Sequence, residues 1–172
     1  MKNVPYASAC GSLMYAMVAT WPDIVHAVGV VSRFIANPGR AHREAIKSIL
    51  RYLEGTNGKC LCYGKGQLQL KGFGDSGMAV DVDTRKSTSG YVYTLASGAI
   101  SWCSRLQRIV ELSTTKSEYI SATEASKEAI WLARLCNVFG MLEKAHILKC
   151  DSQSAICLAR MQCFMLTQSI LM

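Results

Sequence analysis

The stretch VELSTTKSEYISATEASKEAIWLARLCNVF, residues 110–139, decides the fold because it reads as the longest helix of the chain. Thr115 and Glu118 have the S/T-x-x-E spacing of a capping box, and Gly140 follows as a residue that often ends a helix. This pattern predicts a helix over about residues 116–139. Its apolar residues recur at steps of three and four, as one buried helix face requires: Ala122, Ala125, Ala129, Leu132, Cys136 and Phe139.

Glu118 lies at the head of this apolar stripe, and the polar side is predicted to carry Ser117, Ser121, Glu124 and Glu128. A carboxylate that faces a core must be capped, paired or bound to a metal, because burying a charge alone is very costly. On this helix alone two interpretations stay open. Glu118 either closes the capping box or belongs to a functional site.

Composition favours a folded protein with an anionic partner. The 172 residues suffice for one domain, or for one small domain with a helical appendage. A formal net charge of +7 favours a partner such as nucleic acid, although the charge is not gathered in one run. No apolar stretch reaches the roughly 20 residues that a membrane span needs, so no membrane partner is expected.

Eight cysteines lie in apolar periodic segments without a C-x-x-C pair. This usage predicts buried thiols in a reducing, intracellular compartment, the cytoplasm or nucleus. Zinc is not expected, because no histidine has ligand spacing from a cysteine pair. The apolar run after Lys2 is diluted by Ser12, Tyr15 and Thr20, so it is not read as a secretory signal.

Residues 1–58 predict a helical segment with helices over about 8–19, 22–36 and 41–54. The second helix is expected to bury Ile24, Val28, Val31 and Ile35. The third has a basic face that could contact a phosphate backbone, although such a face is more often simply solvated: His42, Arg43, Lys47 and Arg51.

From residue 59 the hydrophobic period changes from 3.6 to 2, which predicts strands. They are expected at 60–64, 67–75, 90–95, 99–103 and 146–150, with a hairpin turn at Ser97–Gly98. A final helix over 152–161 is predicted to turn Ala155, Leu158 and Ala159 inward. An antiparallel meander followed by a helix and a new strand predicts an α/β fold. Its last strand should lie parallel to the strand that it joins.

Three acids occupy special places in this layout. Asp75 ends the first long strand, Glu118 heads the buried stripe, and Asp151 follows the last strand. If the last strand lies beside the first, Asp75 and Asp151 meet at one end of the sheet, and Glu118 leans over them. Taken singly, each acid has a plainer role, as a turn residue, a capping-box partner and a helix N-cap respectively.

Clustered carboxylates repel one another unless a cation neutralises them. Their hard oxygen atoms favour Mg²⁺ or Mn²⁺ over zinc or copper. Two such ions about 4 Å apart can activate a water and stabilise the leaving oxygen of a phosphodiester. The layout therefore predicts a metal-dependent site for nucleic-acid hydrolysis.

The segments RKSTSGY, ISW, LSTT-x-x-EYI and CD-x-QSAI resemble the ribonuclease H domain of copia-type retrotransposon Pol polyproteins. Upstream, GSLMYAMVATWPDIVHAVGVVSRFIANPGRAHREAIKSILRYLEGT resembles the segment that ends the reverse transcriptase. The resemblance implies a ribonuclease H-like three-layer fold over residues 59–172, after a helical segment over 1–58. It implies two divalent ions and cleavage of the RNA strand of an RNA–DNA hybrid.

By position in these motifs, Asp75, Glu118 and Asp151 match the first three metal-binding carboxylates of the family. The family's fourth acid has no counterpart, because the stretch CFMLTQSILM, residues 163–172, stands in its place. The domain is thus expected to be incomplete at its C-terminus, with a partial two-metal site and weak or absent hydrolysis. Gly77 also stands where the family often has a second Asp. The polymerase's paired-Asp motif is absent, so no DNA synthesis is implied.

A second hypothesis is a non-catalytic remnant that binds nucleic acid. Here Arg85, Lys86, Arg105 and Arg108 would hold phosphates, and the acids would be structural. A third is a decayed fragment of such a polyprotein. The expected partners are an RNA–DNA hybrid and the rest of a Pol polyprotein, and the sequence does not indicate an oligomeric state.

Overall fold

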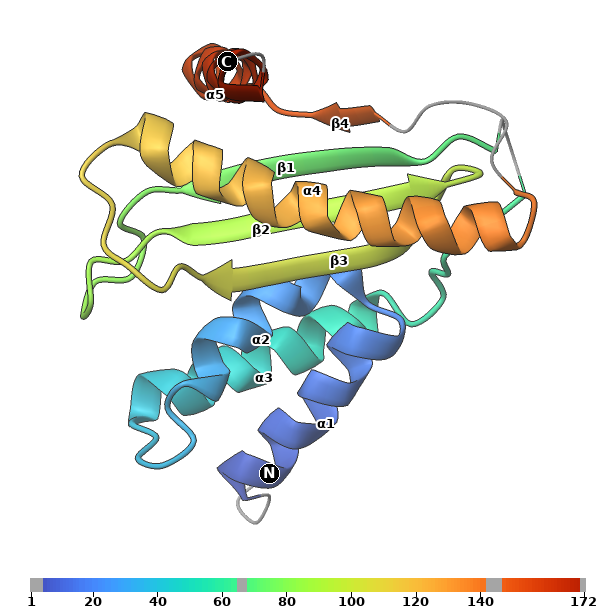
Figure 1. The fold of residues 1–172 in the computed structure, drawn as a ribbon. Helices are drawn as coiled ribbons and strands as arrows, with labels where there is room; N and C mark the ends of the chain where they lie inside the picture. Colours follow the sequence, from blue (N-terminus) through green and yellow to red (C-terminus); the bar gives the residue numbers. More distant parts are fainter. Residues whose placement is uncertain (1–4, 65–67, 142–146, 171–172) are drawn as a thin grey trace. The chain divides into compact units, whose positions relative to one another are not determined.

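A computed structural model describes residues 5–64, 68–141 and 147–170, with side chains up to Met161 (Figure 1). The chain divides into two compact units, residues 1–62 and 63–172. This division falls close to residue 59, where the hydrophobic period changes. Each unit is described by itself below.

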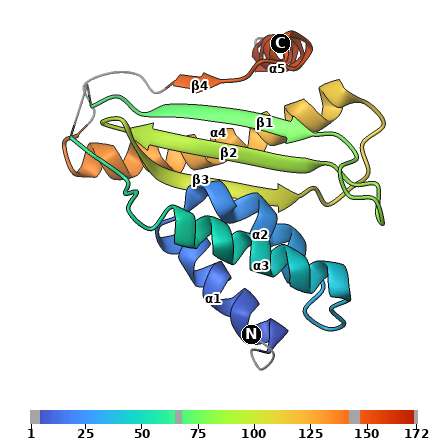
Figure 2. The ribbon, with the colours of Figure 1, turned by 180° about the vertical axis from the view of Figure 1, so that it is seen from behind.

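The first unit is helical, with α1 (Tyr6–Ala19), the short 3-10 helix η1 (Pro22–Ile24), α2 (Val25–Ser32) and α3 (Arg40–Gly55) (Figure 2). The predicted second helix is therefore split, and it ends at Ser32 instead of continuing to residue 36. Ile35 consequently lies outside the helix and is 39% exposed, so its predicted burial is wrong.

Apolar side chains from all these elements form the core of the first unit: Tyr6, Cys10, Leu13, Ile24, Val28, Val31, Ile46 and Ile49. The hydroxyl of Tyr6 donates a hydrogen bond of 2.7 Å to the carbonyl oxygen of Val31. A buried phenol needs such a partner, and this one ties α1 to α2.

The second unit contains a four-stranded mixed sheet in the order β3-β2-β1-β4. Its strands are β1 (Lys71–Gly77), β2 (Thr88–Leu95), β3 (Gly98–Leu106) and β4 (Ile147–Lys149). Neighbours β1, β2 and β3 are antiparallel, whereas β4 pairs with β1 in parallel. The predicted meander and parallel last strand are therefore confirmed. Gln67 and His146, which the sequence placed at strand starts, lie outside the described residues.

The turn between β2 and β3 is tight and consists of Ala96 and Ser97, both with positive φ, +49° and +69°. Two consecutive residues with positive φ are the signature of the turn that matches the natural twist of a hairpin. Glycine or asparagine usually occupies such positions. Gly98, which was expected in the turn, is instead the first residue of β3.

The predicted strand over 60–64 is wrong, because none of these residues pairs with a strand of the sheet. Cys60 and Cys62 are exposed, and their Sγ atoms lie 3.5 Å apart. Cys157 is exposed as well, so the prediction that the cysteines are buried holds only for some, such as Cys10 and Cys136. The segment CLCYG is almost entirely apolar, so it lacks the alternation of apolar and polar residues that predicts a half-buried strand.

Helix α4 (Thr114–Val138) packs along one face of the sheet (Figure 1). The ring of Tyr93 is fully buried beneath it and donates a 2.7 Å hydrogen bond to the carbonyl oxygen of Ala125. Gly72 makes room for this ring, since a Cβ there would lie 2.3 Å from a Tyr93 ring carbon. Helix α4 and the sheet form two layers of the second unit, and the predicted third layer stays a prediction.

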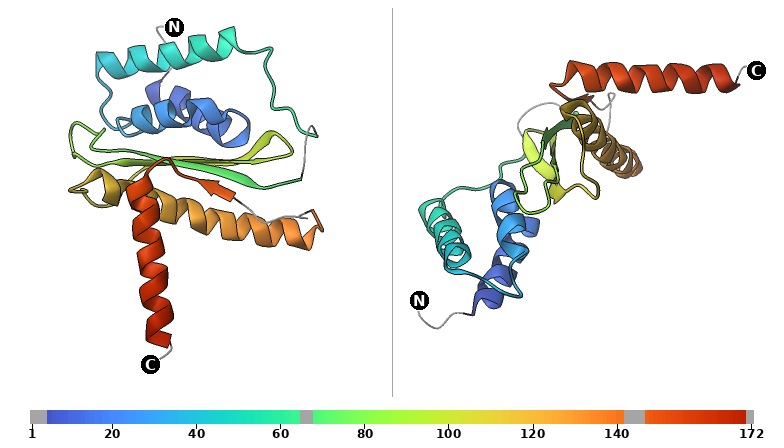
Figure 3. Two further views of the ribbon diagram at one scale, coloured as in Figure 1. Left: turned by 90° about the horizontal axis from the view of Figure 1, so that it is seen from above. Right: turned by 90° about the vertical axis from the view of Figure 1, so that its left-hand side faces the viewer.

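The last helix, α5 (Gln153–Ile170), packs against the first part of α4 and crosses it instead of running alongside (Figure 3). It is longer than the predicted 152–161. Ala155 is buried as expected, but Ala159 is exposed. Within the described residues, no helix is long and apolar enough to cross a membrane.

A candidate carboxylate site beside a separate basic pocket

Helix α4 is capped by Ser113 and not by Thr115. The Ser113 hydroxyl accepts a 3.3 Å hydrogen bond from the backbone N–H of Lys116, and the helix begins at Thr114. The third helical position is therefore Lys116, and the predicted capping box of Thr115 and Glu118 does not form. Glu118 lies in the second turn, so capping does not account for it.

The buried face of α4 is rotated from the predicted one. Ser117 and Ser121, which were placed on the polar side, are fully buried, whereas Phe139 is 63% exposed. The Ser117 hydroxyl donates to the Ser76 hydroxyl at 2.9 Å. The Ser121 hydroxyl donates to the carbonyl oxygen of Asp75 at 2.6 Å. Because both hydroxyls have partners on β1, burying them carries little penalty.

Parallel pairing of β1 with β4 places the two predicted aspartates toward the same end of the sheet. Phe73 of β1 is in register with Lys149 of β4. Asp75 and Asp151 each lie two residues after these positions. Asp151 follows the end of β4, but Asp75 is still inside β1 and pairs with Gly90, so the prediction that Asp75 ends its strand is wrong. The parallel pairing is as the sequence predicted, but Asp75 is not among the ligand atoms that come together at this end of the sheet.

Glu118 and Asp151 are brought together, and Cys150 joins them. One possible ligand atom from each of the three lies within 4.8 Å of the other two. Oε2 of the half-buried Glu118 is shielded from solvent and has no hydrogen-bond partner in the described part of the chain. A shielded carboxylate oxygen without a partner in the chain is costly, and a bound cation or water would satisfy it.

The electrostatics of Glu118 agree with this geometry. Burial raises the pKa of its carboxyl group above the ordinary value, and the nearby charges of Asp75 and Asp151 raise the pKa further. Hydrogen bonds from Ser76 act in the opposite direction and lower the pKa. The site therefore concentrates negative charge that a cation would relieve.

Asp75 is placed differently from the other two acids. Its side chain is exposed, it accepts a 2.8 Å hydrogen bond from the backbone N–H of Ser76, and it is not part of the 4.8 Å cluster. Successive residues of a strand point to opposite faces. Because Ser76 contacts α4, Asp75 points away from the helix, and only its charge acts on Glu118.

Asp151 is not the N-cap of α5. The hydroxyl of Ser152 accepts a 3.3 Å hydrogen bond from the backbone N–H of Ala155, which is the capping interaction. A second serine, Ser154, accepts a 3.1 Å hydrogen bond from the hydroxyl of Thr115 and links α5 to α4. Capping therefore does not explain Asp151, and its carboxylate is left for the cluster.

Two features of this region were missed from the sequence. Cys150 was counted as a buried thiol, although its position directly before Asp151 places it at the same strand end. Glu111 is 3% exposed, and its Oε2 lies 3.5 Å from Nζ of Lys116. This ion pair joins Lys116 of the first turn of α4 to a buried carboxylate that the sequence analysis did not single out.

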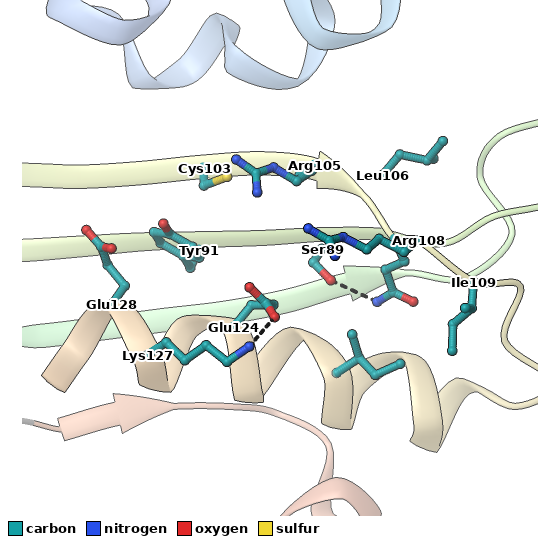
Figure 4. A pocket seen from close by; sticks show the side chains of 12 residues that line it. Ser89, Tyr91, Cys103, Arg105, Leu106, Arg108, Ile109, Glu124, Lys127 and Glu128 are labelled. Atoms are coloured by element: carbon teal, nitrogen blue, oxygen red, sulfur yellow. Dashed lines mark hydrogen bonds and ion pairs between the residues drawn. The ribbon is translucent and has the colours of Figure 1, made fainter. Parts of the chain in front are cut away.

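The four basic residues predicted to bind nucleic acid fall into two places. Arg85 and Lys86 lie in the loop before β2. Arg105 and Arg108 line a pocket of about 530 Å³ between the end of β3 and α4 (Figure 4). This pocket contains none of the three predicted acids.

The chain is similar to a region of several known proteins. It is 59% identical over 160 residues to the Pol polyprotein of the transposon TNT 1-94 from Nicotiana tabacum, which covers 93% of this chain but 12% of that protein. It is 38% identical over 152 residues to the Pol polyprotein of the Arabidopsis thaliana transposon RE1, covering 87% of this chain and 10% of that protein. The chain thus spans a small part of these polyproteins.

A shorter relative is matched almost completely. The secreted RxLR effector protein 161 of Plasmopara viticola is 48% identical over 133 residues, which are 77% of this chain and 94% of that protein. No protein-family model matches the chain. No solved structure matches it either.

Proposed function

We propose that this chain carries a ribonuclease H-like domain after the end of a reverse transcriptase. The chain belongs to the family that includes a region of the copia-type retrotransposon Pol polyproteins. It is homologous to that region, and its function as a hybrid nuclease is our inference. In this proposal the second unit binds an RNA–DNA hybrid and divalent cations and hydrolyses the RNA strand weakly or not at all.

The observation that carries the proposal is the convergence of Glu118 and Asp151. They are 33 positions apart in sequence, on a helix and after a strand, yet their oxygen atoms come within 4.8 Å. The alternative roles in helix capping do not apply to either residue. A partnerless, shielded oxygen on Glu118 further supports a cation at this position.

The donor set fits Mg²⁺ or Mn²⁺ in part. The carboxylates of Glu118 and Asp151 are the hard ligands that these ions prefer. The charge of Asp75 is near enough to raise the pKa of Glu118. When bound, such ions supply water activation and stabilisation of the leaving oxygen. Glu118 and Asp151 would hold the cation, and the hydrogen bonds of Ser76 would orient the Glu118 carboxylate.

The same geometry argues for low activity. Asp75 lies outside the cluster, and the third ligand atom within it is the thiol sulfur of Cys150, which is a poor ligand for a hard cation. A second metal would therefore lack oxygen ligands. This observation favours the alternative function, a non-catalytic domain that binds nucleic acid, as the second candidate.

The proposal extends to the cellular setting. We infer that the chain works inside the cell. Its similarity to a region of two Pol polyproteins supports the separate inference that it is part of a longer polyprotein. The basic residues Arg85, Lys86, Arg105 and Arg108 are proposed to contact phosphates of the hybrid.

The metal site is tested by thermal unfolding with and without divalent ions. Mg²⁺ or Mn²⁺ should raise the melting temperature of the full chain by linkage, and Asp151→Asn should abolish the rise. The matched control is Asp83→Asn, an exposed loop aspartate outside the cluster, which should keep it. An equal rise in all three proteins would mean that the ions bind elsewhere.

The activity is tested with a labelled RNA–DNA hybrid and Mn²⁺. Slow cleavage that Glu118→Gln removes would support the nuclease. Binding of the hybrid without cleavage, unaffected by Glu118→Gln, would establish the non-catalytic alternative. A chain that neither binds nor cleaves the hybrid would contradict both functions.

A further inference from the structure

We propose that the pocket between β3 and α4 is a second ligand site, which binds a nucleoside 5′-phosphate. The pocket has a volume of about 530 Å³, within the range of roughly 300–1,000 Å³ typical of small-molecule sites. The same chemistry is offered by a free nucleotide and by the 5′-phosphorylated end of a strand. The experiment below distinguishes these two sources.

The anion-binding part of the pocket is formed by Arg105 and Arg108. Both side chains are exposed, and neither makes an ion pair within the described part of the chain. Figure 4 shows their guanidinium groups pointing in the same direction along the pocket. Two planar guanidinium groups without partners suit a phosphate monoester, because each can donate two parallel hydrogen bonds.

The opposite wall of the pocket offers hydrogen-bond acceptors and an aromatic ring. Glu124 and Glu128 rise from α4 toward the sheet, and Tyr91 lies between Glu128 and Ser89 (Figure 4). Glu124 is paired with Lys127 at 2.7 Å, and Glu128 accepts a 2.6 Å hydrogen bond from Ser101. Carboxylates can accept from the amino groups of a nucleobase, while the half-buried ring supplies apolar contact.

The pocket is formed before any ligand binds, because buried Gln107 joins its walls. The Nε2 group of Gln107 donates to the hydroxyl of Ser89 at 2.8 Å and to the carbonyl oxygen of Ser117 at 3.0 Å. The end of β3 is thus fixed to both β2 and α4. A preformed site costs little to order on binding.

The pocket is independent of the carboxylate cluster. Its helix residues, Ile120, Glu124, Lys127 and Glu128, are spaced to share one face of α4. Glu118 is two residues before Ile120, a rotation of about 200° around the helix. The inference therefore does not rest on the metal site or on cleavage, although it uses Arg105 and Arg108, which are also proposed above to contact phosphates of the hybrid.

The test uses adenosine 5′-monophosphate with the full chain in the presence of a chelator, so that metal at the carboxylate cluster plays no part. Calorimetry should detect binding to the wild type. The double variant Arg105→Gln/Arg108→Gln should bind about tenfold more weakly or worse, since charge-assisted hydrogen bonds are lost. Arg134→Gln, an exposed arginine of α4 outside the pocket, is the matched control and should bind as the wild type does.

A second readout locates the ligand. Cys103 lines the pocket, so the nucleotide should slow its alkylation by iodoacetamide, measured site by site by mass spectrometry. The exposed Cys60 and Cys62 serve as internal controls and should react at an unchanged rate. Equal protection of Cys103 in the double variant would mean that Arg105 and Arg108 do not hold the nucleotide, and no protection in the wild type would place the nucleotide elsewhere; either result would overturn the proposal.

Further ligands define what the pocket selects. If inorganic phosphate binds as tightly as the nucleotide, the nucleoside contributes nothing and the proposal is wrong. If adenosine binds as tightly as adenosine 5′-monophosphate, the arginines contribute nothing to binding, and the proposal is again wrong. If a 5′-phosphorylated oligonucleotide displaces the nucleotide and its unphosphorylated form does not, the natural ligand is the end of a strand. If neither oligonucleotide displaces the nucleotide, the natural ligand is a free nucleotide. Either result supports the site.

Discussion

The two halves of the buried face of α4 are built by different means. The C-terminal half buries apolar side chains, and the first three of these pack with Leu70 and Tyr93: Ala129, Leu132, Ala133 and Cys136. The N-terminal half buries Ser117 and Ser121, which hydrogen-bond to β1. Hydrophobic packing is strong but not directional, whereas hydrogen bonds fix position at a small net gain. The helix is therefore anchored at one end and aligned at the other, where Glu118 lies.

The largest expected effect comes from the apolar half. Leu132→Ala should lower the free energy of unfolding by about 3 kcal/mol, because it removes a buried side chain and leaves a cavity. Urea denaturation measures the change. Leu135→Ala is the matched control, since Leu135 is 39% exposed against 4% for Leu132. Equal losses in both variants would contradict the anchoring role of this half.

Tyr93 lies under the middle of the helix, and Tyr93→Phe should cost about 1 to 2 kcal/mol, because the carbonyl oxygen of Ala125 loses its donor. Burial raises the pKa of Tyr93 to about 12 from 10.0. The Tyr93 hydroxyl therefore ionises at a lower pH in the unfolded chain than in the folded one. Its contribution to the free energy of unfolding is complete below pH 10 and is lost as the pH rises to about 12. Denaturation at several alkaline pH values should show a shallower loss in Tyr93→Phe than in the wild type.

The polar half should give a smaller effect. Ser121→Ala removes the donor to the carbonyl oxygen of Asp75 and should cost about 1 kcal/mol. Ser126→Ala is the control, because Ser126 is exposed and bonds only to Ala122 of its own helix. If the two variants are equally stable, the hydrogen bonds between α4 and β1 do not align the helix.

The smallest expected effect concerns Glu118, whose pKa is raised by burial and then by Asp75 and Asp151. A raised pKa means that the folded state disfavours the ionised carboxylate, so stability without metal falls as the pH rises through this pKa. Glu118→Gln should therefore be slightly more stable than the wild type at pH 7 in a chelator. Its stability should also change less between pH 4 and 7. A less stable variant would mean that the charge is compensated by a partner within the chain.

The arrangement of elements could be read from the sequence, but the rotation of α4 could not. The meander, the long helix and the parallel strand follow from hydrophobic periods and from the crossover between them. Glu118 and Asp151 were predicted to meet for the same reason, and they do.

The rest depended on partners that a sequence does not show. Ser117 and Ser121 look like surface residues until Ser76 and the backbone of β1 are placed beside them. The outward direction of Asp75 follows from strand alternation. It required knowing that Gly72 and Gly74 face α4, since a Cβ at these positions would meet Tyr93 and Ala125.

The Ala96–Ser97 turn has a practical consequence for work with this protein. Both residues hold a backbone conformation that side chains with a Cβ disfavour. The strand pairing on either side therefore offsets a local strain that Asn-Gly would not have. Replacing Ala96 and Ser97 with Asn-Gly should therefore raise the stability of the protein. The substitution should leave both ligand sites unchanged, because none of the residues discussed for them lies in this turn.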